Sequence, residues 1–397
     1  MDNIITVMTI LILADTEFTN DPRIIRQAAS LQNNSFSVVV LCLKMNGEND
    51  VGEIQGITYQ RFYDSKIHDI KAVSYHQHIC DSILEQFEFD CVHCHNESML
   101  NIAVMMKKRK PVPIIYDSHE LFHAWPLNVS SKCFSIRIKS IVIRHWAIRR
   151  EKHNSRYIDY CITVCDSLAD NLWKYFKLRE RPLVVRNIPQ FTEIKSKSNI
   201  LREYFNIPKQ TKILVFIGIH IYPKTLNLEQ VIDEVKNKEN LALLFITTFN
   251  EGKRAIENYA DSVGAQNVFF HEAIHPDEIP NYLSSADVGL VPTWNKKDLS
   301  YWYALDNKLF EYILAGIPVL ATRQPEYVKI VEQYSVGICV NPDLNGDYRR
   351  GLIDILNNYQ YYIEKNEHIR KILNWENEVE TFIDFYKQIR PDVEKCS

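Results

Sequence analysis

Residues 304–320 read Ala-Leu-Asp-Asn-Lys-Leu-Phe-Glu-Tyr-Ile-Leu-Ala-Gly-Ile-Pro-Val-Leu, and they predict a helix followed directly by a buried strand. Gly316 suits a helix C-terminus, and Pro318 prevents the helix from continuing. Residues 319–321 then read as a short buried strand. A helix that leads into such a strand is the repeating unit of an α/β fold. The apolar residues that recur at helical spacing, and so form the buried face, are Leu309, Ile313 and Leu314.

The start of this helix has groups that suit a nucleotide. Asp306 or Asn307 can cap the helix N-terminus, where free N–H groups and a partial positive charge attract phosphate. Lys308 and Glu311 lie three residues apart and therefore share a face. A cation beside a phosphate-binding helix end, followed by a carboxylate that accepts two hydroxyl protons, suits a diphosphate and a ribose. The alternative is an ordinary helix–strand unit unrelated to nucleotides.

The segment from lysine-leucine-phenylalanine-glutamate-tyrosine to alanine-glycine-isoleucine-proline-valine resembles family 4 glycosyltransferases, which have the GT-B fold. The resemblance covers nearly the whole chain. It implies an α/β fold of two doubly wound, Rossmann-like domains whose parallel sheets face a central cleft. It also implies a nucleotide diphosphate sugar as the donor substrate, with no resident cofactor.

Size and composition agree with a two-domain globular protein. The chain has 397 residues, of which 46% are hydrophobic and 24% charged. A net charge of −4 gives no reason to expect nucleic acid as a partner. Nine cysteines without a framework spacing indicate reduced thiols and a cytoplasmic protein. The apolar residues 4–14 lack a basic flank and are too short to span a bilayer, so we expect them to form a first buried strand.

Strands and helices alternate along the chain, and a polar stretch at 187–198 divides them into two series. We therefore expect an N-terminal acceptor-side domain at 1–190 and a nucleotide-sugar-binding domain at 191–374. In GT-B proteins the last helix, here about 371–390, returns to the N-terminal domain, so we assign about 375–397 to that domain. The expected strands lie near 4–14, 36–44, 57–62, 90–94, 112–116, 160–164, 183–186, 213–217, 241–247, 267–271, 287–291, 317–321 and 337–340.

Two motifs in the N-terminal half resemble functional segments of the family. Thr19–Ile25 resembles the loop and helix that face the acceptor, which makes Asp21 and Arg23 candidates on the acceptor side. Tyr116-Asp117-Ser118-His119-Glu120-Leu121 follows a buried strand and resembles a motif whose histidine approaches the donor sugar. His119 is therefore a candidate catalytic residue, and the alternative is a loop histidine that bonds the backbone.

The C-terminal half carries candidates for binding the donor. Gly218 ends the first strand of the domain, and Lys224 matches a family lysine that binds the diphosphate. The family arginine of this loop is missing, since Ile219 or His220 occupies its position, and Lys308 is the candidate to replace it. A plain surface lysine is the alternative for Lys224.

Glu311 matches the second of two family glutamates and is expected to bind the ribose, with Asn307 and Leu309 beside it in the motif. Tyr303 stands where many members have the first glutamate, which contacts the donor sugar. Glu272 falls in the segment that resembles the base-binding loop. Asp287 is better explained as a structural cap than as a ligand.

Metal and haem sites are not expected. Cys91-Val92-His93-Cys94-His95 formally matches a haem attachment signal, but the chain shows no export signal. Zinc binding by the same cluster is an alternative that lacks a second pair of ligands. No Asp-x-Asp pair is present to hold a diphosphate-bound metal. Cationic side chains and a helix end are expected to neutralise the leaving group instead.

Residues 131–156 form a basic segment with an apolar face at helical spacing. Such a helix either docks on anionic lipid or packs its apolar face in the core with its basic face in water, and both readings stay open. The first would make the protein peripheral on the inner face of the membrane. The residues of the apolar face are Phe134, Ile138, Ile141, Val142 and His145.

The resemblance implies a retaining glycosyltransferase, and with the basic segment it leads us to expect a glycan or lipid-linked acceptor in cell-surface polysaccharide or glycolipid synthesis. Lys224, Lys308 and the helix end would stabilise the departing diphosphate, while His119 positions the donor sugar. Two alternatives are a GT-B sugar-nucleotide epimerase and a non-catalytic subunit that binds nucleotide sugars. Assays with and without an acceptor distinguish the three.

Overall fold

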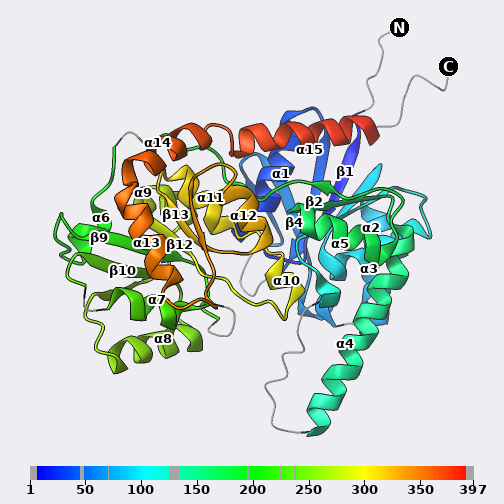
Figure 1. The fold of residues 1–397 in the computed structure, drawn as a ribbon. Helices are drawn as coiled ribbons and strands as arrows, with labels where there is room; N and C mark the ends of the chain where they lie inside the picture. The colour runs from blue at the N-terminus through cyan, green and yellow to red at the C-terminus, as the bar shows by residue number, and fades with distance from the viewer. Residues whose placement is uncertain are drawn as a thin grey trace. The chain divides into compact units, whose positions relative to one another are not determined.

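The computed structural model describes residues 7–44, 49–69, 71–124, 134–194, 196–222, 226–236 and 238–389, with the backbone alone at 134–137 and 139. The chain forms two compact units (Figure 1). The first contains residues 1–186 and 379–397, and the second contains 187–378. The sequence placed these divisions at 190/191 and 374/375.

The first unit is built on an eight-stranded sheet in the order β3-β4-β2-β1-β5-β6-β7-β8. All neighbouring strands are parallel except β3 and β4. The strands are β1 (Thr9–Leu13), β2 (Ser37–Leu43), β3 (Val51–Ile54), β4 (Ile57–Tyr63), β5 (Cys91–His95), β6 (Ile114–Ser118), β7 (Tyr160–Thr163) and β8 (Leu183–Val184). The helices are α1 (Pro22–Asn33), α2 (Val73–Gln86), α3 (Asn96–Lys107), α4 (Phe134–Asn154), α5 (Asp166–Phe176) and the part of α15 (Trp375–Ile389) from Val379 onward.

The second unit has a fully parallel six-stranded sheet in the order β11-β10-β9-β12-β13-β14. Its strands are β9 (Lys212–Ile217), β10 (Leu241–Ile246), β11 (Val268–His271), β12 (Val288–Val291), β13 (Val319–Thr322) and β14 (Gly337–Val340). Its helices are α6 (Ile200–Tyr204), α7 (Leu228–Val235), α8 (Glu251–Ser262), α9 (Ile279–Ser284), α10 (Leu299–Trp302), α11 (Asn307–Leu314), α12 (Pro325–Val331), α13 (Asp347–Asn357) and α14 (Tyr359–Ile369). Five short 3-10 helices complete the described elements: η1 (Phe18–Asn20), η2 (Ser65–His68), η3 (Phe122–Ala124), η4 (Ser155–Tyr157) and η5 (Pro276–Glu278).

Burial on both faces explains the long apolar runs of the central strands. Strands β1, β5 and β6 are buried along almost their whole length. In the second unit, alternate residues of the sheet pack with α7, α8 and α13 in one hydrophobic core. The strands expected from the sequence are confirmed. The first of them is described from Thr9 onward, since residues 1–6 lie outside the described part.

Strand β3 is the element of the first sheet that the sequence did not predict. It joins β4 through a two-residue turn in which Gln55 and Gly56 both have positive φ, 51° and 79°. Two left-handed residues form the turn that suits the twist of a hairpin. The glycine lowers the strain of this conformation, and the pairing adds an antiparallel edge strand to an otherwise parallel sheet.

Tyr312 fixes helix α11 against the sheet of the second unit. Strands β9 and β12 pair only at Val288 and Gly289, and both strands continue beyond this point. The Tyr312 hydroxyl accepts from the Ile217 N–H at 3.0 Å and donates to the Leu290 carbonyl at 3.2 Å. A Cβ at Gly289 would lie 2.1 Å from the tyrosine ring, so glycine is required for this approach. The helix start is thereby held at the carboxyl edge of the sheet, where ligands bind in such folds.

No helix in the described part of the chain is both long and apolar enough to cross a bilayer. The seven cysteines that the structure describes are all buried.

Candidate active site

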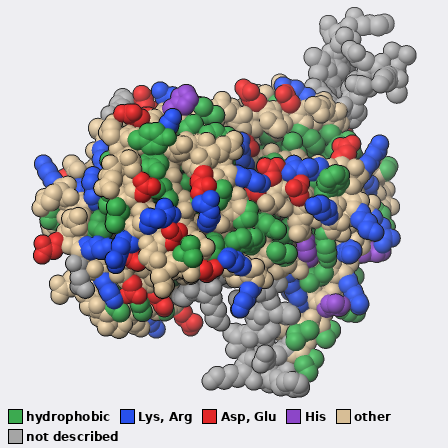
Figure 2. Space-filling model, in the orientation of Figure 1, with side chains coloured by type: hydrophobic (Ala, Val, Ile, Leu, Met, Phe, Trp, Pro, Cys, Tyr) green, Lys and Arg blue, Asp and Glu red, His purple; other side chains and the backbone are tan. Residues whose placement is uncertain are grey.

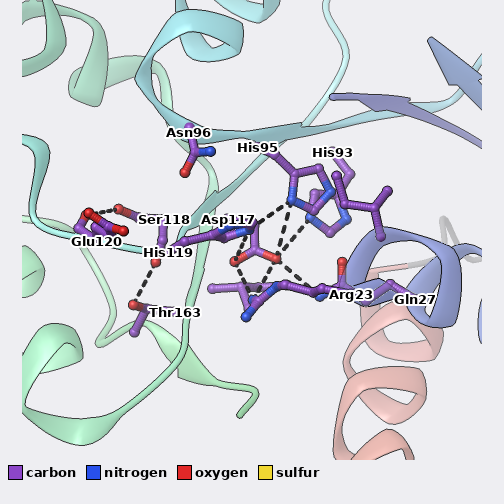
Figure 3. A network of polar contacts seen from close by, with 12 residues as sticks. Arg23, Gln27, His93, His95, Asn96, Asp117, Ser118, His119, Glu120 and Thr163 are labelled. Atoms are coloured by element: carbon purple, nitrogen blue, oxygen red, sulfur yellow. Dashed lines mark hydrogen bonds and ion pairs between the residues drawn. The ribbon is translucent and has the colours of Figure 1, made fainter. Parts of the chain in front are cut away.

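The carboxyl edge of the first sheet contains a buried ion pair between Asp117, near the end of β6, and Arg23 of α1 (Figure 3). Arg23 Nη2 donates to both carboxylate oxygens, at 2.7 and 2.8 Å. One helical turn further on, Gln27 Nε2 donates to Asp117 Oδ2 at 3.1 Å. Arg23 is 4% exposed, while Asp117 and Gln27 are fully buried. Helix α1 therefore seals one side of the carboxylate.

Three histidines surround the other side of Asp117. His93 and His95 of β5 place Nε2 and Nδ1, respectively, 3.5 and 3.7 Å from Asp117 Oδ2. His119 follows β6, and its Nε2 lies 3.8 Å from Asp117 Oδ1 and 3.0 Å from His95 Nδ1. The rings of His93 and His95 stack with centroids 4.5 Å apart, and Tyr386 of α15 bonds His93 Nδ1 at 2.6 Å.

The ionisation of this cluster follows from its burial. Burial alone would raise the pKa of Asp117, but the Arg23 charge and the His119 contact outweigh it and hold the pKa well below its usual range. Burial lowers the pKa of His93, and it lowers that of His95 well below the ordinary value. The site therefore contains a carboxylate anion, a guanidinium cation and two neutral imidazoles on β5.

The same cluster has the spacing of a metal site. Ligand atoms of His93, His95 and Asp117 lie within 4.8 Å of one another, and no thiol belongs to this group. Arg23, however, contacts both carboxylate oxygens and already supplies the compensating charge. A divalent ion would have to bind beside a buried guanidinium, which Coulomb repulsion disfavours. The residues therefore fit an ion pair better than a metal.

His119 is the member of the cluster that reaches the surface, with its side chain 23% exposed. The motif at 116–121 identified this histidine, but it did not identify Gln27, His93 or His95 as its neighbours. The available signal was positional: residues 93 and 95 sit at the carboxyl end of a buried strand that neighbours β6. Polar side chains there are expected to point toward a ligand site rather than into the core.

The two residues predicted for the acceptor side lie in α1 or at its start. Asp21 caps the helix by accepting from the Ile24 N–H at 3.2 Å, and the Thr16 hydroxyl donates to its other oxygen. Arg23 points inward to Asp117. Both residues thus have structural partners, and their contact with an acceptor stays a prediction.

In the second unit, the first turn of α11 gathers polar groups at the carboxyl edge of the sheet. Asp306 occupies the N-cap position, but its side chain does not cap the helix. Its carboxylate instead accepts from the Thr293 hydroxyl at 2.8 Å and from Lys308 Nζ at 3.1 Å. Lys308 Nζ also lies 5.4 Å from the Phe216 ring centre, near the end of β9. Lys308 is therefore held against the helix end.

The remaining residues predicted for the donor site differ in how much of each side chain is exposed to solvent. Asn307 is exposed and Glu311 is half-buried, whereas Leu309 is fully buried and its N–H donates to the Asp306 carbonyl. Gly218 directly follows β9, and its N–H donates to the Ile246 carbonyl. Tyr303, at the position of the first family glutamate, is half-buried at the end of α10.

Glu272 follows β11, its side chain is 73% exposed, and it pairs with the buried Lys253 at 2.7 Å. Lys224 lies outside the described residues. Asp287 lies at the opposite edge of the sheet, just before β12. It is held by Lys197, Arg202 and the Ile213 N–H, which agrees with a structural role.

Comparison with known proteins gives two family matches and many structural ones. Residues 23–187 match the model of Glycosyltransferase Family 4, and residues 211–358 match that of Glycosyl transferases group 1. A search of curated protein sequences found no match.

Among solved structures, the chain is similar to sucrose-phosphate synthase from Thermosynechococcus elongatus (TM-score 0.75, 15% identity, 96% of this chain and 98% of that chain). It is also similar to HepE from Anabaena in complex with UDP-glucose (TM-score 0.70, 12% identity, 96% and 99%). A third is WaaG, a glycosyltransferase involved in lipopolysaccharide biosynthesis (TM-score 0.65, 15% identity, 95% and 99%). At these identities the likeness establishes the fold.

The two family models match consecutive segments that together cover most of the chain, one in each compact unit. The structural matches extend over both units. The chain therefore belongs to the family 4 (group 1) glycosyltransferases and is a transferase enzyme with the GT-B fold.

Proposed function

We propose that the protein transfers a sugar from a nucleotide diphosphate sugar to an acceptor hydroxyl with retention of anomeric configuration. The observation that carries this proposal is the start of α11, where Lys308 lies beside a helix N-terminus that the Asp306 side chain does not cap, at the carboxyl edge of the sheet. Such a helix end is suited to a diphosphate. The similar HepE structures hold UDP and UDP-glucose, which supports a donor of this class.

The proposed residues act on different parts of the donor. Lys308, together with Lys224, stabilises the negative charge that develops on the departing diphosphate. Glu311 accepts hydrogen bonds from the two ribose hydroxyls. Glu272 lies beside the base, although it must share its carboxylate with Lys253. His119 of the first unit holds a hydroxyl of the donor sugar.

The reaction needs no enzymic nucleophile in this proposal. The bond between the sugar's anomeric carbon and the diphosphate oxygen breaks, and a bond from that carbon to the acceptor oxygen forms on the same face. The acceptor proton passes to an oxygen of the leaving diphosphate. The products are a glycoside and a nucleoside diphosphate, and the charge on the latter is neutralised by lysine and helix end rather than by a metal.

A donor screen tests the proposal. The purified protein is incubated with a panel of nucleotide sugars, with and without lipid-linked acceptors, and released nucleoside diphosphate and glycoside are measured. Release that depends on an acceptor supports transfer. Conversion of the donor to a different sugar nucleotide without an acceptor indicates an epimerase instead. Nucleotide binding without either product would indicate a non-catalytic subunit that binds nucleotide sugars.

The acceptor is proposed to be a lipid-linked glycan of a cell-surface polymer or glycolipid, reached from the cytoplasmic face. The observation that favours this is the exposed apolar side of α4. Ile138, Ile141 and Val142 are 47–52% exposed, and Trp146 is 68% exposed. In Figure 2 the surface over α4 carries hydrophobic side chains beside histidine, lysine and arginine.

This exposure bears on the two readings of the basic segment. The described part of its apolar face is not packed in a core, whereas the other side of α4 buries Ala147 and Glu151. Exposed apolar residues beside Arg149 and Lys152 have the chemistry of a helix that lies on an anionic bilayer. Each such cation contributes about 1 kcal/mol near the surface, and salt screens it.

Vesicle sedimentation tests the membrane contact. Binding to vesicles with phosphatidylglycerol should fall steeply from low to high salt. The triple variant Ile141→Ser, Val142→Ser, Trp146→Ser should abolish binding, whereas Trp173→Ser, which removes an exposed tryptophan from α5, should not. Equal sedimentation of the triple variant and the parent chain would refute docking through α4.

A further inference from the structure

Two side chains, His95 and Asp117, lie beside Nε2 of the His119 ring. This nitrogen lies 3.0 Å from His95 Nδ1 and 3.8 Å from Asp117 Oδ1 (Figure 3). We propose that His95 and Asp117 are positioning residues of the transferase: they fix the orientation and tautomer of His119, so that its Nδ1 faces the donor sugar. The proposal rests on the role given above to His119 in sugar transfer.

A contact of 3.0 Å between two ring nitrogens constrains the proton between them. Such a separation is a hydrogen bond only if one nitrogen carries the proton and the other accepts it. His95 is fully buried, and burial keeps it neutral, so it has one proton to place on one of two nitrogens. Whichever ring donates, the tautomer of one is set by the other. His119 therefore cannot rotate without breaking this bond, and it cannot change tautomer unless His95 changes tautomer with it.

Asp117 is in turn immobile, which makes the support rigid. Arg23 bonds both of its oxygens, Gln27 bonds one, and all three side chains are at least 96% buried. The ion pair couples α1 to β6, while His95 enters from β5. Three elements thus converge behind one partly exposed imidazole, which is the arrangement expected when a side chain must be held in one geometry.

His93 provides an internal comparison. It lies two residues before His95 on the same strand, is equally buried, and stacks on the His95 ring. Its Nδ1 bonds Tyr386 rather than His119. Loss of the Tyr386 hydroxyl should therefore perturb the buried cluster without disturbing the bond that orients His119.

Two substitutions at His95 separate positioning from packing. The amide of asparagine falls near the Nδ1 position of histidine, whereas the amide of glutamine falls near Nε2. His95→Asn should therefore keep kcat within about threefold of the parent chain. His95→Gln should lower kcat by about a hundredfold, the effect of a misplaced catalytic group, with little change in the KM for the donor. Tyr386→Phe is the matched control and should keep kcat while lowering the melting temperature.

Equal kcat for His95→Asn and His95→Gln, or a loss confined to KM, would overturn the proposal. A direct measurement covers the case in which a variant fails to fold. Two-bond ¹H–¹⁵N spectra of the parent chain, labelled with ¹⁵N-histidine, should show a single tautomer for His119. The His119 signal is assigned as the one that is missing from the spectrum of His119→Ala. An averaged spectrum would refute the fixed tautomer.

The spectroscopic experiment does not depend on turnover. If no donor and acceptor pair gives transfer, the proposed function fails while the tautomer still reports on His95. If His119→Ala keeps full transfer activity, His119 has no role in the reaction, and a single tautomer would then be structural only, which would also overturn the positioning role.

Discussion

Replacement of Arg23 by methionine should destabilise the N-terminal unit by about 3–5 kcal/mol, the cost of leaving one member of a buried ion pair without its partner. Asp117 is fully buried and Arg23 is 4% exposed, so water cannot replace the lost guanidinium. Gln27 would keep one hydrogen bond to the carboxylate. The two histidines of β5 are poor replacement cations, because burial is the largest cause that lowers the pKa of each.

The stability lost in Arg23→Met should be measured at a pH chosen from the direction in which the Asp117 pKa is shifted. The pKa of Asp117 in the folded chain is held well below its ordinary value of 3.8, burial being outweighed by Arg23 and His119. Its stabilising contribution is therefore present above that value and is lost as the pH falls through the lower, folded value. At pH 7 the full cost of removing Arg23 should be seen. Removing both charges, in Arg23→Met with Asp117→Leu, should recover most of the loss.

Native-state hydrogen exchange is the suitable assay, because two compact units make a single global unfolding transition an unsafe measure. At about 1.4 kcal/mol per tenfold, the exchange of β6 amides should accelerate by about a hundredfold to a few thousandfold. The control is Arg181→Met in the same unit, which removes pairs with Asp166 and Asp170, both at 2.7 Å, from an arginine whose side chain is 36% exposed. Such pairs contribute about 0–1 kcal/mol. Acceleration below tenfold in Arg23→Met, or equal to that of the control, would refute the reasoning.

Four further predictions concern the donor site, metal and pH. Glu311→Gln should weaken UDP binding by about tenfold or more, because charge-assisted hydrogen bonds are worth roughly 1.5–3 kcal/mol; unchanged affinity in calorimetry, with the fold intact, would remove Glu311 from the site. Lys308→Ala and Lys224→Ala should each lower kcat by about 10²–10³ while weakening UDP binding less. A variant that keeps a kcat near that of the parent chain would show that its lysine does not stabilise the leaving diphosphate. A chelator should leave transfer intact, whereas loss of activity that magnesium or manganese restores would contradict charge neutralisation by lysine and helix end. Burial is the main cause that raises the pKa of Glu151 from 4.5 to about 8, and the charge of Glu97 is the second. The free energy of unfolding of the first unit should therefore fall by up to about 1.4 kcal/mol per pH unit between those values. Glu151→Gln should flatten this slope, measured by native-state hydrogen exchange of β6 amides at a series of pH values, and an unchanged slope would show that Glu151 is ionised when folded.

Local patterns predicted the two sheets well, because their central strands are buried on both faces and read as continuous apolar runs. The elements they missed are short or weakly apolar. Strand β3 has the sequence Val-Gly-Glu-Ile and depends on a turn geometry, while α6 and α10 have five and four residues. Helices this short are set by tertiary contacts rather than by propensity.

The candidate site shows a sharper limit of sequence reasoning. His119 and Glu311 could be found because each lies within a local motif. The ion pair between Arg23 and Asp117 joins residues 94 positions apart, and neither local sequence indicates that the other residue is its partner. Arg23 points to a carboxylate within its own unit, and its contact with an acceptor stays a prediction. Contacts of this kind depend on which helix covers which strand end.

The bond from the Ile217 amide to the Tyr312 hydroxyl gives the second unit an internal reporter. In a regular sheet the hydrogen of such an amide would be protected by a neighbouring strand, but here its acceptor is a side chain of α11. Exchange at this one amide therefore measures how often α11 lifts from the sheet, separately from the opening of β9 itself. If nucleotide binds at the start of that helix, saturating UDP should slow exchange at Ile217 more than at Leu214, deep in the same strand. A single backbone hydrogen would then serve as a binding assay that needs no knowledge of the sugar or the acceptor.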